Sequence, residues 1–318
     1  MTKMPSMRVL VTGSEGLVGT ELCKRLVAAG HTVERMDIKL FHAANASIYQ
    51  DVTERYDCAE RVRNFSPDGV IHLAACSRVL WGEERPEQCA RTNVGGTANM
   101  LHALTKGWFL FVSSREVYGN PTTFPVTEDA PRLPINTYGW TKALGEEMTF
   151  EARKREINAG VVRLSNVYGR TTDHPDRVLP AFAHAAAVGR PMHVAGSQKR
   201  FDFVHVEDAA RGIQAAAAYL HSGKQLPTIH FTTGVGTTLE TLAHKCNTAA
   251  KRLGLPGAEI RARDVKGYEV NGCVGDNARA NDVLGWQPRV AIDDGIEMMV
   301  AAYGGVTLDD AAGLASAS

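Results

Sequence analysis

Short apolar segments of strand length alternate with amphipathic segments along the first half of the chain. Residues 7–12 form a β-prone apolar run, and a helical pattern of apolar positions extends from residue 17 to residue 29. Further segments of strand length occupy residues 31–37, 69–75 and 109–114, and residues 69–75 form a continuous apolar run. Continuous apolar runs are typical of strands that are buried on both faces. The alternation therefore predicts an α/β protein with a doubly wound, parallel sheet of the Rossmann type.

The regular alternation ends after a further strand, which we expect at residues 161–169. We expect a first domain over residues 1–169, to which segments of the C-terminal half return. A smaller C-terminal lobe should be built mainly from residues 170–304. Residues 305–318 are mostly small and polar, and we expect them to form a flexible tail.

Three glycines, Gly13, Gly16 and Gly19, follow the first strand at the start of the first helix. A glycine at position 13 allows the chain to reverse, and Gly16 allows the backbone to approach a pyrophosphate. Gly19 allows the helix to pack closely on the strand. Because the N-terminus of a helix carries free N–H groups and partial positive charge, this turn is predicted to bind the phosphates of a dinucleotide.

An acidic residue, Asp37, ends the second predicted strand, 18 residues beyond Gly19. A carboxylate at this place accepts hydrogen bonds from the adenosine ribose and repels a 2′-phosphate. The sequence therefore favours NAD over NADP.

The composition argues against several classes of protein. Among the 318 residues, Lys plus Arg and Asp plus Glu each number 35, so the chain lacks the excess positive charge of a nucleic-acid or membrane-surface binder. The first strand begins too early for a signal peptide, and no apolar run is long enough to span a bilayer, so a cytoplasmic protein is expected. The six cysteines and the histidines lack metal-ligand spacing, and we predict no metal.

Candidate catalytic residues lie where two further predicted elements end or begin. Tyr138 and Lys142 are four residues apart and should share one face of a helix. A lysine ammonium beside a phenol favours the phenolate, so Tyr138, helped by the positive charge of the nicotinamide, could act as a base near neutral pH. Ser113 and Ser114 end a predicted strand, at the edge of the sheet where parallel α/β proteins place their ligands.

These motifs, together with Asn93-Val-Gly-Gly-Thr97, resemble the extended short-chain dehydrogenase/reductase family, in particular its nucleotide-sugar epimerase/dehydratase branch. The resemblance extends from about Met7 to about Gly304. It implies that NAD oxidises a nucleotide sugar, which we expect to be UDP-linked, at C4 and is regenerated within each turnover. It also implies a homodimer that pairs through the helices containing Asn93 and Tyr138.

The resemblance assigns roles residue by residue. The catalytic serine stands five residues before the glycine of Val117-Tyr-Gly119, which selects Ser114 to act with Tyr138 and Lys142. Cofactor contacts are implied at Gly13, Gly16, Leu17, Val18, Asp37, Asp51, Val52, Leu73, Ala74, Ala75, Tyr138 and Lys142. Substrate contacts are implied at Cys76, Arg115, Asn166, Arg200 and Arg279.

Positions 115 and 116 bear on the reaction. In the sugar-nucleotide 4,6-dehydratases an Asp and a Glu follow the catalytic Thr, and they act as the acid and the base of dehydration. Here Arg115 and Glu116 follow Ser114, so the base is kept and the acid is absent. A guanidinium cannot donate a proton at working pH, although it could stabilise an enolate.

Several reactions stay open. Our main prediction is Glu116-assisted loss of water across C5 and C6 of a UDP-hexosamine such as UDP-N-acetylglucosamine, as in the 5,6-dehydratases of tunicamycin (antibiotic) biosynthesis. A 4-epimerase, which needs only Ser114, Tyr138 and Lys142, is the alternative. Decarboxylation of UDP-glucuronate ranks third, and a catalytically silent NAD-binding sensor is the non-enzymatic alternative.

The resemblance implies three substrate contacts in the later part of the chain, and one of them depends on strand register. Asn166 ends an R-x-x-N motif and would contact the nucleotide diphosphate. Phe201 occupies the position of the phosphate-binding arginine of the family, and Arg200 is one residue away. A one-residue step on a strand turns a side chain to the other face unless the chain bulges. Arg279 is the second candidate for binding phosphate.

Overall fold

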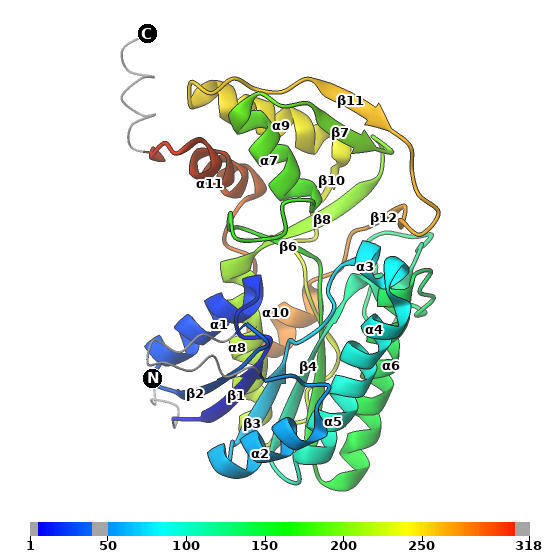
Figure 1. The fold of residues 1–318 in the computed structure, drawn as a ribbon, viewed down its shortest axis with the longest axis vertical. Coiled ribbons are helices and arrows are strands. Elements are labelled where there is room, and N and C mark those ends of the chain that lie inside the picture. The colour runs from blue at the N-terminus through cyan, green and yellow to red at the C-terminus, as the bar shows by residue number, and fades with distance from the viewer. Residues whose placement is uncertain (1–5, 40–49, 309–318) are drawn as a thin grey trace.

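The computed structural model describes residues 6–39 and 50–308. Within this part of the chain the larger sheet has six parallel strands in the order β2-β1-β3-β4-β5-β9 (Figure 1). In chain order these strands are β1 (Arg8–Thr12), β2 (Thr32–Met36), β3 (Gly69–His72), β4 (Trp108–Ser114), β5 (Asn158–Leu164) and β9 (Ile229–Phe231). The last strand returns from the C-terminal half of the chain and closes one edge of the sheet.

Helices cover both faces of this sheet because alternate residues of each strand point in opposite directions. Val9 and Val11 of β1 pack in one core with α1 (Leu17–Ala28) and α8 (Val206–His221). Leu10 points to a second core on the other face, against α2 (Arg55–Phe65), α5 (Gly96–Ala103) and α6 (Thr137–Ala152). Figure 1 shows α1 and α8 on one side of the sheet and α5 and α6 on the other. The predicted doubly wound fold is confirmed.

The strand order reverses between β1 and β3. The chain runs from β1 outward to β2 and then crosses back to β3, on the other side of β1. In open parallel sheets the crevice beyond the carboxyl ends of such strands is where ligands bind. The glycine turn after β1 and the segment after β3 both lie at this crevice.

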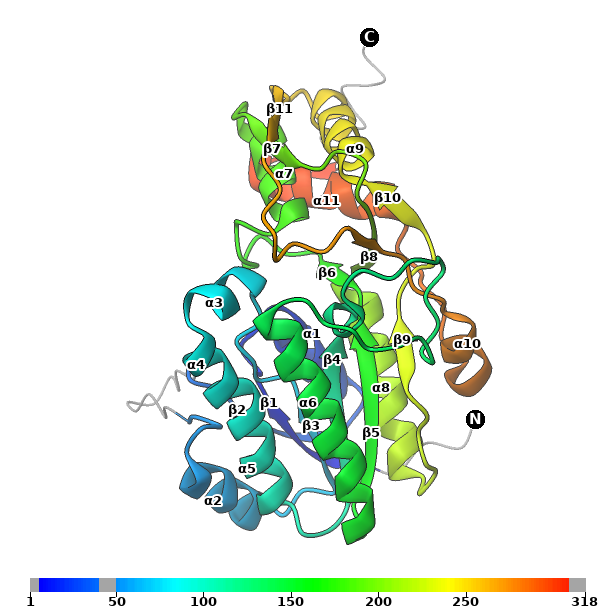
Figure 2. The same ribbon diagram turned by 90° about the vertical axis from the view of Figure 1, so that its right-hand side faces the viewer.

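The smaller lobe has its own sheet and its own core (Figure 2). In this sheet β8 (Arg200–His205) pairs with β10 (Gly236–Thr238), β12 (Gly272–Cys273) and β6 (Asn166–Tyr168). The lobe core is built around α7 (Val178–Val188), α9 (Leu239–Arg252) and α11 (Ile292–Gly304). A two-stranded sheet, β7 (Met192–Ala195) and β11 (Ile260–Arg263), lies at its outer end.

Short helices connect the larger elements. They are α3 (Val79–Glu84), α4 (Pro86–Ala90), a π-helical segment (Arg91–Gly95), two 3₁₀ segments (Arg115–Tyr118 and Arg153–Arg155) and α10 (Ala278–Leu284). None of the helices among the described residues is long and apolar enough to cross a membrane.

One predicted strand is wrong in its extent. The run 161–169 is divided: β5 ends at Leu164, and β6 begins at Asn166 in the other sheet. Ser165 separates the two because its backbone N–H bonds to Phe231 while its hydroxyl bonds to Asp202 of β8. The sequence pattern does not mark the break, because buried apolar residues lie on both sides of it. Of the expected tail 305–318, residues 309–318 lie outside the described part of the chain.

Candidate active site

The glycine turn after β1 is shaped by close backbone contacts. Gly13 has φ +69°, and a Cβ atom there would lie 2.6 Å from the backbone nitrogen of Ala74. A Cβ on Gly19 would lie 2.1 Å from the carbonyl oxygen of Gly13. These two positions therefore accept only glycine, and the absence of side chains brings α1, the turn and the segment after β3 into direct contact.

The turn leaves polar groups available for an anion. Helix α1 begins at Leu17, and its N-cap, Gly16, provides no side-chain hydrogen bond to the first free N–H groups. The buried Ser14 hydroxyl has no hydrogen-bond partner within the described residues. Free N–H donors at a helix N-terminus and an unpartnered hydroxyl suit a pyrophosphate. Leu17 and Val18 form the first turn of α1 at this place.

The groups around the glycine turn also suit an adenosine ribose. Asp37 lies at the carboxyl end of β2, where its two carboxylate oxygens accept hydrogen bonds from the backbone N–H groups of Glu15, at 3.0 Å, and Lys39, at 2.9 Å. The one arginine of β2, Arg35, is paired with Glu15 at 2.7 Å. The carboxylate is thus held at the edge of the turn, as a ribose-binding acid requires.

The other implied cofactor positions lie on neighbouring segments. The backbone N–H groups of Leu73 and Ala74 donate to Thr12 at the end of β1, and Ala75 follows them into the crevice. Asp51 accepts a hydrogen bond from the backbone of Thr53 at 2.8 Å. Val52 is buried and packs against Gly96 of α5, where an added Cβ would lie 2.6 Å from its side chain.

The structure brings Ser114, Tyr138 and Lys142 together. Ser114 ends β4; its hydroxyl accepts a hydrogen bond from the backbone N–H of Glu116 at 3.2 Å and lies close enough to Tyr138 to lower the pKa of the phenol. Tyr138 and Lys142 are buried in the first turns of α6, which begins there because the Asn136 side chain caps the helix by accepting from the N–H of Gly139 at 2.8 Å. The Lys142 ammonium donates to the carbonyl oxygen of Val112 at 2.9 Å, and it lies 5.9 Å from the centroid of the Tyr138 ring.

Burial dominates the titration of this group. It raises the pKa of Tyr138 to about 12, against the charge of Arg177 and the nearby Ser114 hydroxyl, which lower it. Burial also lowers the pKa of Lys142, from 10.5 to about 8. The protein's own side chains therefore leave the pKa of Tyr138 above its usual value, and the predicted action as a base near neutral pH depends on the nicotinamide as well. The positive charge of an oxidised nicotinamide is the further contribution that would lower the phenol pKa.

Glu116 is engaged with two partners. Its carboxylate is 2.9 Å from the Arg115 guanidinium and accepts a hydrogen bond from the Asn136 side chain at 2.8 Å. The residue is only 5% exposed. Because Asn136 also caps α6, Glu116 is connected to the helix that carries Tyr138.

Arg115 is held on several sides. Its Nε and Nη2 atoms donate to the Asn166 side-chain oxygen at 3.2 and 3.0 Å. Its guanidinium lies 4.9 Å from the centroid of the Phe201 ring. Arg115, Asn166 and Phe201 therefore form one surface between the two sheets, next to Glu116.

Two predicted phosphate-binding arginines are not brought to this surface. Strand β8 pairs without a bulge, so Arg200 points to the opposite face from Phe201, which contacts Arg115. Arg279 donates to the Asp129 carboxylate and to the backbone oxygen of Thr228. Its charge is balanced by that ion pair, as in an ordinary structural arginine.

Sequence reasoning missed residues that the lobe contributes to the crevice. Arg177, which immediately precedes α7, donates to Ser77 at 3.5 Å and acts electrostatically on Tyr138. In the same region Arg78 forms a bidentate ion pair with Asp176. No local motif marks these residues, because their pairing joins segments about a hundred positions apart.

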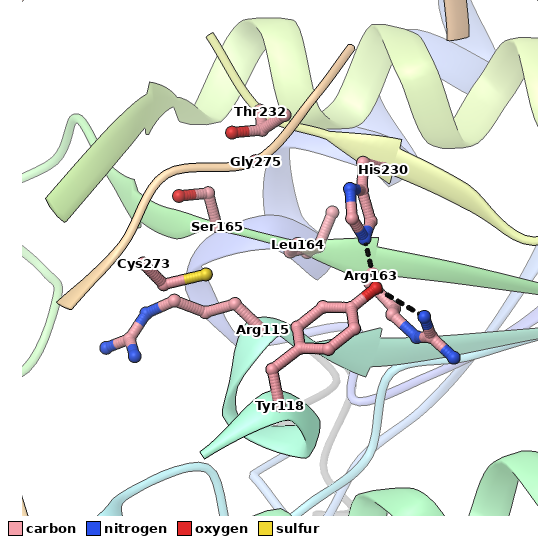
Figure 3. A pocket seen from close by; sticks show the side chains of 9 residues that line it. All are labelled: Arg115, Tyr118, Arg163, Leu164, Ser165, His230, Thr232, Cys273 and Gly275. Atoms are coloured by element: carbon pink, nitrogen blue, oxygen red, sulfur yellow. Dashed lines mark hydrogen bonds between the residues drawn. The ribbon is translucent and has the colours of Figure 1, made fainter. Parts of the chain in front are cut away.

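A buried polar network lies behind the catalytic group (Figure 3). Arg163 donates to the hydroxyl of Tyr118, which bonds in turn to His230. Burial lowers the pKa of His230 to about 3, so the ring is neutral. Its Nδ1 donates to the Asp276 carbonyl oxygen, which leaves Nε2 to accept from Tyr118. In Figure 3 Arg115 extends away from this cluster, on the side of Cys273.

The network continues to β4, the strand that ends at Ser114. Arg163 forms two hydrogen bonds with the Glu146 carboxylate, at 2.8 and 2.7 Å, and the hydroxyl of Ser113 donates to the same carboxylate at 2.6 Å. Glu146 lies one turn beyond Lys142 on α6. The ends of β4, β5 and β9 are thus fixed relative to α6, which positions Ser114 against Tyr138.

The fold, the glycine turn and the Ser-Tyr-Lys group together define a dinucleotide-dependent enzyme that oxidises and reduces an alcohol carbon. Residues 9–229 match the NAD dependent epimerase/dehydratase family, and the chain belongs to that family. It is an NAD-dependent enzyme that modifies nucleotide sugars.

Individual relatives carry different activities. The chain is 30% identical to a UDP-glucose 4-epimerase from Mycolicibacterium smegmatis over 92% of its own length and 97% of that relative. It is 29% identical to a dTDP-glucose 4,6-dehydratase from Streptomyces griseus, with 93% of each chain covered. The crystal structure of a UDP-glucose 4-epimerase from Thermotoga maritima with UDP-glucose has a TM-score of 0.82 and 25% identity, and the match covers 93% of this chain and 98% of the other.

Proposed function

We propose that this protein is a 4-epimerase of UDP-hexoses. The observation that carries the proposal is the state of Glu116. Both oxygens of Glu116 already have a partner, Arg115 or Asn136, so the carboxylate would have to give up one of these contacts to reach C5. Epimerisation requires only the Ser114, Tyr138 and Lys142 group, and the similarity to UDP-glucose 4-epimerases supports the same reaction.

The residues that would hold NAD are those of the crevice. The N–H groups at the start of α1 and the Ser14 hydroxyl would bind its phosphates, and Asp37 its adenosine ribose. When bound, NAD supplies the oxidising and reducing equivalents of the reaction. The cofactor is tightly held in this proposal, because it returns to its starting state in each turnover.

The protein's own side chains would accept and return the proton of the sugar C4 hydroxyl. The Ser114 hydroxyl would hydrogen-bond to the C4 oxygen of the sugar, and the Tyr138 phenol oxygen would take the hydroxyl proton. Tyr138 would return this proton after the sugar ring has turned its other face toward the group. Lys142, fixed on the Val112 carbonyl, would hold positive charge beside the phenol below a pH of about 8. The buried position of Tyr138 would exclude water from the exchange.

The substrate would lie between the two sheets. Arg115 and Asn166 are the proposed contacts for the nucleotide diphosphate or the sugar, and Cys76 lies at the nicotinamide end of the crevice. Arg177 of the lobe would face the reacting carbon, because its charge already acts on Tyr138.

The test is incubation of the purified protein with UDP-glucose, and separately with UDP-galactose, in deuterated water. We expect each sugar to be converted to the other with no change in mass and no deuterium in the product. Glu116→Gln should keep at least about a tenth of the wild-type rate, because the amide retains a hydrogen-bonding oxygen for Asn136. A product that has lost water would refute the proposal.

A dehydratase acting on UDP-N-acetylglucosamine is the second candidate. Glu116 supports it, because this carboxylate is near enough to raise the pKa of Tyr138 and would have to leave Arg115 to reach C5. Dehydration should yield a product lighter by one water that has taken up deuterium, and Glu116→Gln should abolish it. The same deuterated-water experiment with this substrate distinguishes the two reactions.

A homodimer is also proposed. Trp140 and Leu144 are 56% and 49% exposed, and they lie one turn apart on the outer face of α6. Exposing two large apolar side chains on one helix face to water is unfavourable in free energy, and a second copy of the same helix would cover them. This face is separate from Tyr138 and Lys142, which point inward.

A further inference from the structure

Two cysteines from different segments meet beside the catalytic group. Cys76 follows β3 in the segment that borders the crevice, and Cys89 lies in α4. Their sulfurs lie close enough for each thiol to shift the pKa of the other, and both are reduced. Cys76 is partly exposed, whereas Cys89 is fully buried.

Asn93 holds both cysteines in place. Its side-chain oxygen accepts from the backbone N–H of Cys76 at 2.7 Å, and its amide nitrogen is 3.5 Å from the sulfur of Cys89. The same nitrogen donates to the Thr141 hydroxyl at 2.8 Å. The pair is therefore attached to the residue that precedes Lys142 on α6.

The two thiols differ in reactivity. The neighbouring Cys89 thiol lowers the pKa of Cys76 to about 7, with help from the backbone of Arg78 and the charge of Arg85 and against the effect of burial. The thiolate, which is the nucleophile in oxidation, is therefore favoured at Cys76, which is also the more exposed of the two cysteines. The same contact raises the pKa of Cys89. Burial raises the pKa of the remaining four thiols to about 11 or 12: Cys23, Cys58, Cys246 and Cys273.

We propose that Cys76 and Cys89 form a peroxide-sensitive pair, in which Cys76 is oxidised first and Cys89 then closes a disulfide. The Cys76 thiolate attacks one oxygen of hydrogen peroxide, the O–O bond breaks, and after protonation one water leaves and Cys76 is a sulfenic acid. The sulfur of Cys89 then attacks that of Cys76. The S–O bond breaks, and the oxygen leaves as a second water with the proton of Cys89. The two thiols lose two electrons in total, and the peroxide gains them.

The disulfide would change the surroundings of the catalytic helix. Cys89 now contacts Asn93 and lies 4.0 Å from the Thr141 hydroxyl, and a bond to Cys76 would replace these contacts. The segment after β3 would be tied covalently to α4. This inference goes beyond the proposed reaction and does not depend on it.

The experiment treats the NAD-loaded protein with hydrogen peroxide, blocks free thiols with N-ethylmaleimide and maps peptides by mass spectrometry. We expect a loss of two hydrogens, one peptide pair joined through Cys76 and Cys89, and full reversal by dithiothreitol. In Cys89→Ser, dimedone should label Cys76 as a sulfenic acid. In Cys246→Ser, which changes an equally buried cysteine, the same disulfide should form.

Other results would overturn the proposal. In the wild-type protein these are direct conversion of Cys76 to a sulfinic acid, a disulfide between other cysteines, or no change in the masses of the Cys76 and Cys89 peptides at peroxide concentrations that oxidise free glutathione. The wild-type measurement shows whether Cys76 and Cys89 form a disulfide even if Cys89→Ser does not fold. Because every readout is a mass, failure here is distinguishable from an absence of epimerase activity.

Discussion

The buried Glu146 carboxylate gives a prediction whose size follows from the structure. Glu146 is fully buried and pairs with Arg163, which is 4% exposed, through two hydrogen bonds. Glu146→Gln keeps the volume of the side chain and removes its charge, so no cavity contributes. Removing one partner of a buried ion pair leaves an uncompensated charge, which costs about 3–5 kcal/mol.

The loss should be visible in thermal unfolding. At roughly 2 °C per kcal/mol, the lower end of the range for large domains, the midpoint of unfolding should fall by roughly 6–10 °C. The measurement is the shift in midpoint by circular dichroism or scanning calorimetry, with wild type and variant at the same protein and NAD concentrations. Arg132, which also pairs with Glu146 at 3.1 Å, adds to the effect.

A matched control lies at the next position of the helix. Glu147 pairs with the same Arg132, but its side chain is 56% exposed. Exposed ion pairs contribute roughly 0–1 kcal/mol, so Glu147→Gln should shift the midpoint by no more than roughly 2 °C. Equal shifts in the two variants, or a shift of less than roughly 2 °C for Glu146→Gln, would refute the reasoning about the buried charge.

Three further predictions concern catalysis, titration and assembly. Tyr138→Phe should lower the turnover rate by at least about 10²-fold while bound NAD, measured by absorbance after denaturation, stays stoichiometric; loss of NAD would contradict the catalytic role. The buried Lys142 binds its proton less tightly when folded (pKa about 8) than when unfolded (about 10.5), so its contribution to stability should improve as pH rises between these values. The difference in unfolding free energy between the wild type and Lys142→Met should therefore shift in favour of the wild type over this pH range, and a constant difference would contradict the assignment. Trp140→Glu should convert a dimer to a monomer in sedimentation velocity, with Tyr56→Glu, an equally large exposed change on α2, as the control.

Local patterns were sufficient where the physical requirement is local. The reversal at Gly13 and the helix spacing of Tyr138 and Lys142 depend on neighbouring residues, and both could be predicted from the sequence. The fold class could be predicted as well, because a strand buried on both faces must be continuously apolar.

Long-range contacts explain what the sequence did not predict. Whether Arg200 or Phe201 faces Arg115 is decided by how β8 pairs with three other strands, and none of these partners is adjacent in sequence. The division of the strand at Ser165 depends on Asp202, which lies in another sheet. The Glu116 carboxylate accepts a hydrogen bond from Asn136, which is twenty residues away. The sequence motif around Glu116 could not show this contact, and it therefore favoured Glu116 as a base.

The fixed position of Arg115 has a consequence for selectivity. Asn166, Glu116 and the Phe201 ring together restrict its guanidinium before any ligand arrives. A flexible side chain loses roughly 0.5–1.5 kcal/mol of rotamer entropy when a ligand immobilises it, and Arg115 has already lost that freedom on folding. A rigid cation of this kind discriminates between ligands by where their negative charge falls, so a small displacement of that charge should weaken binding more than it would at a mobile arginine.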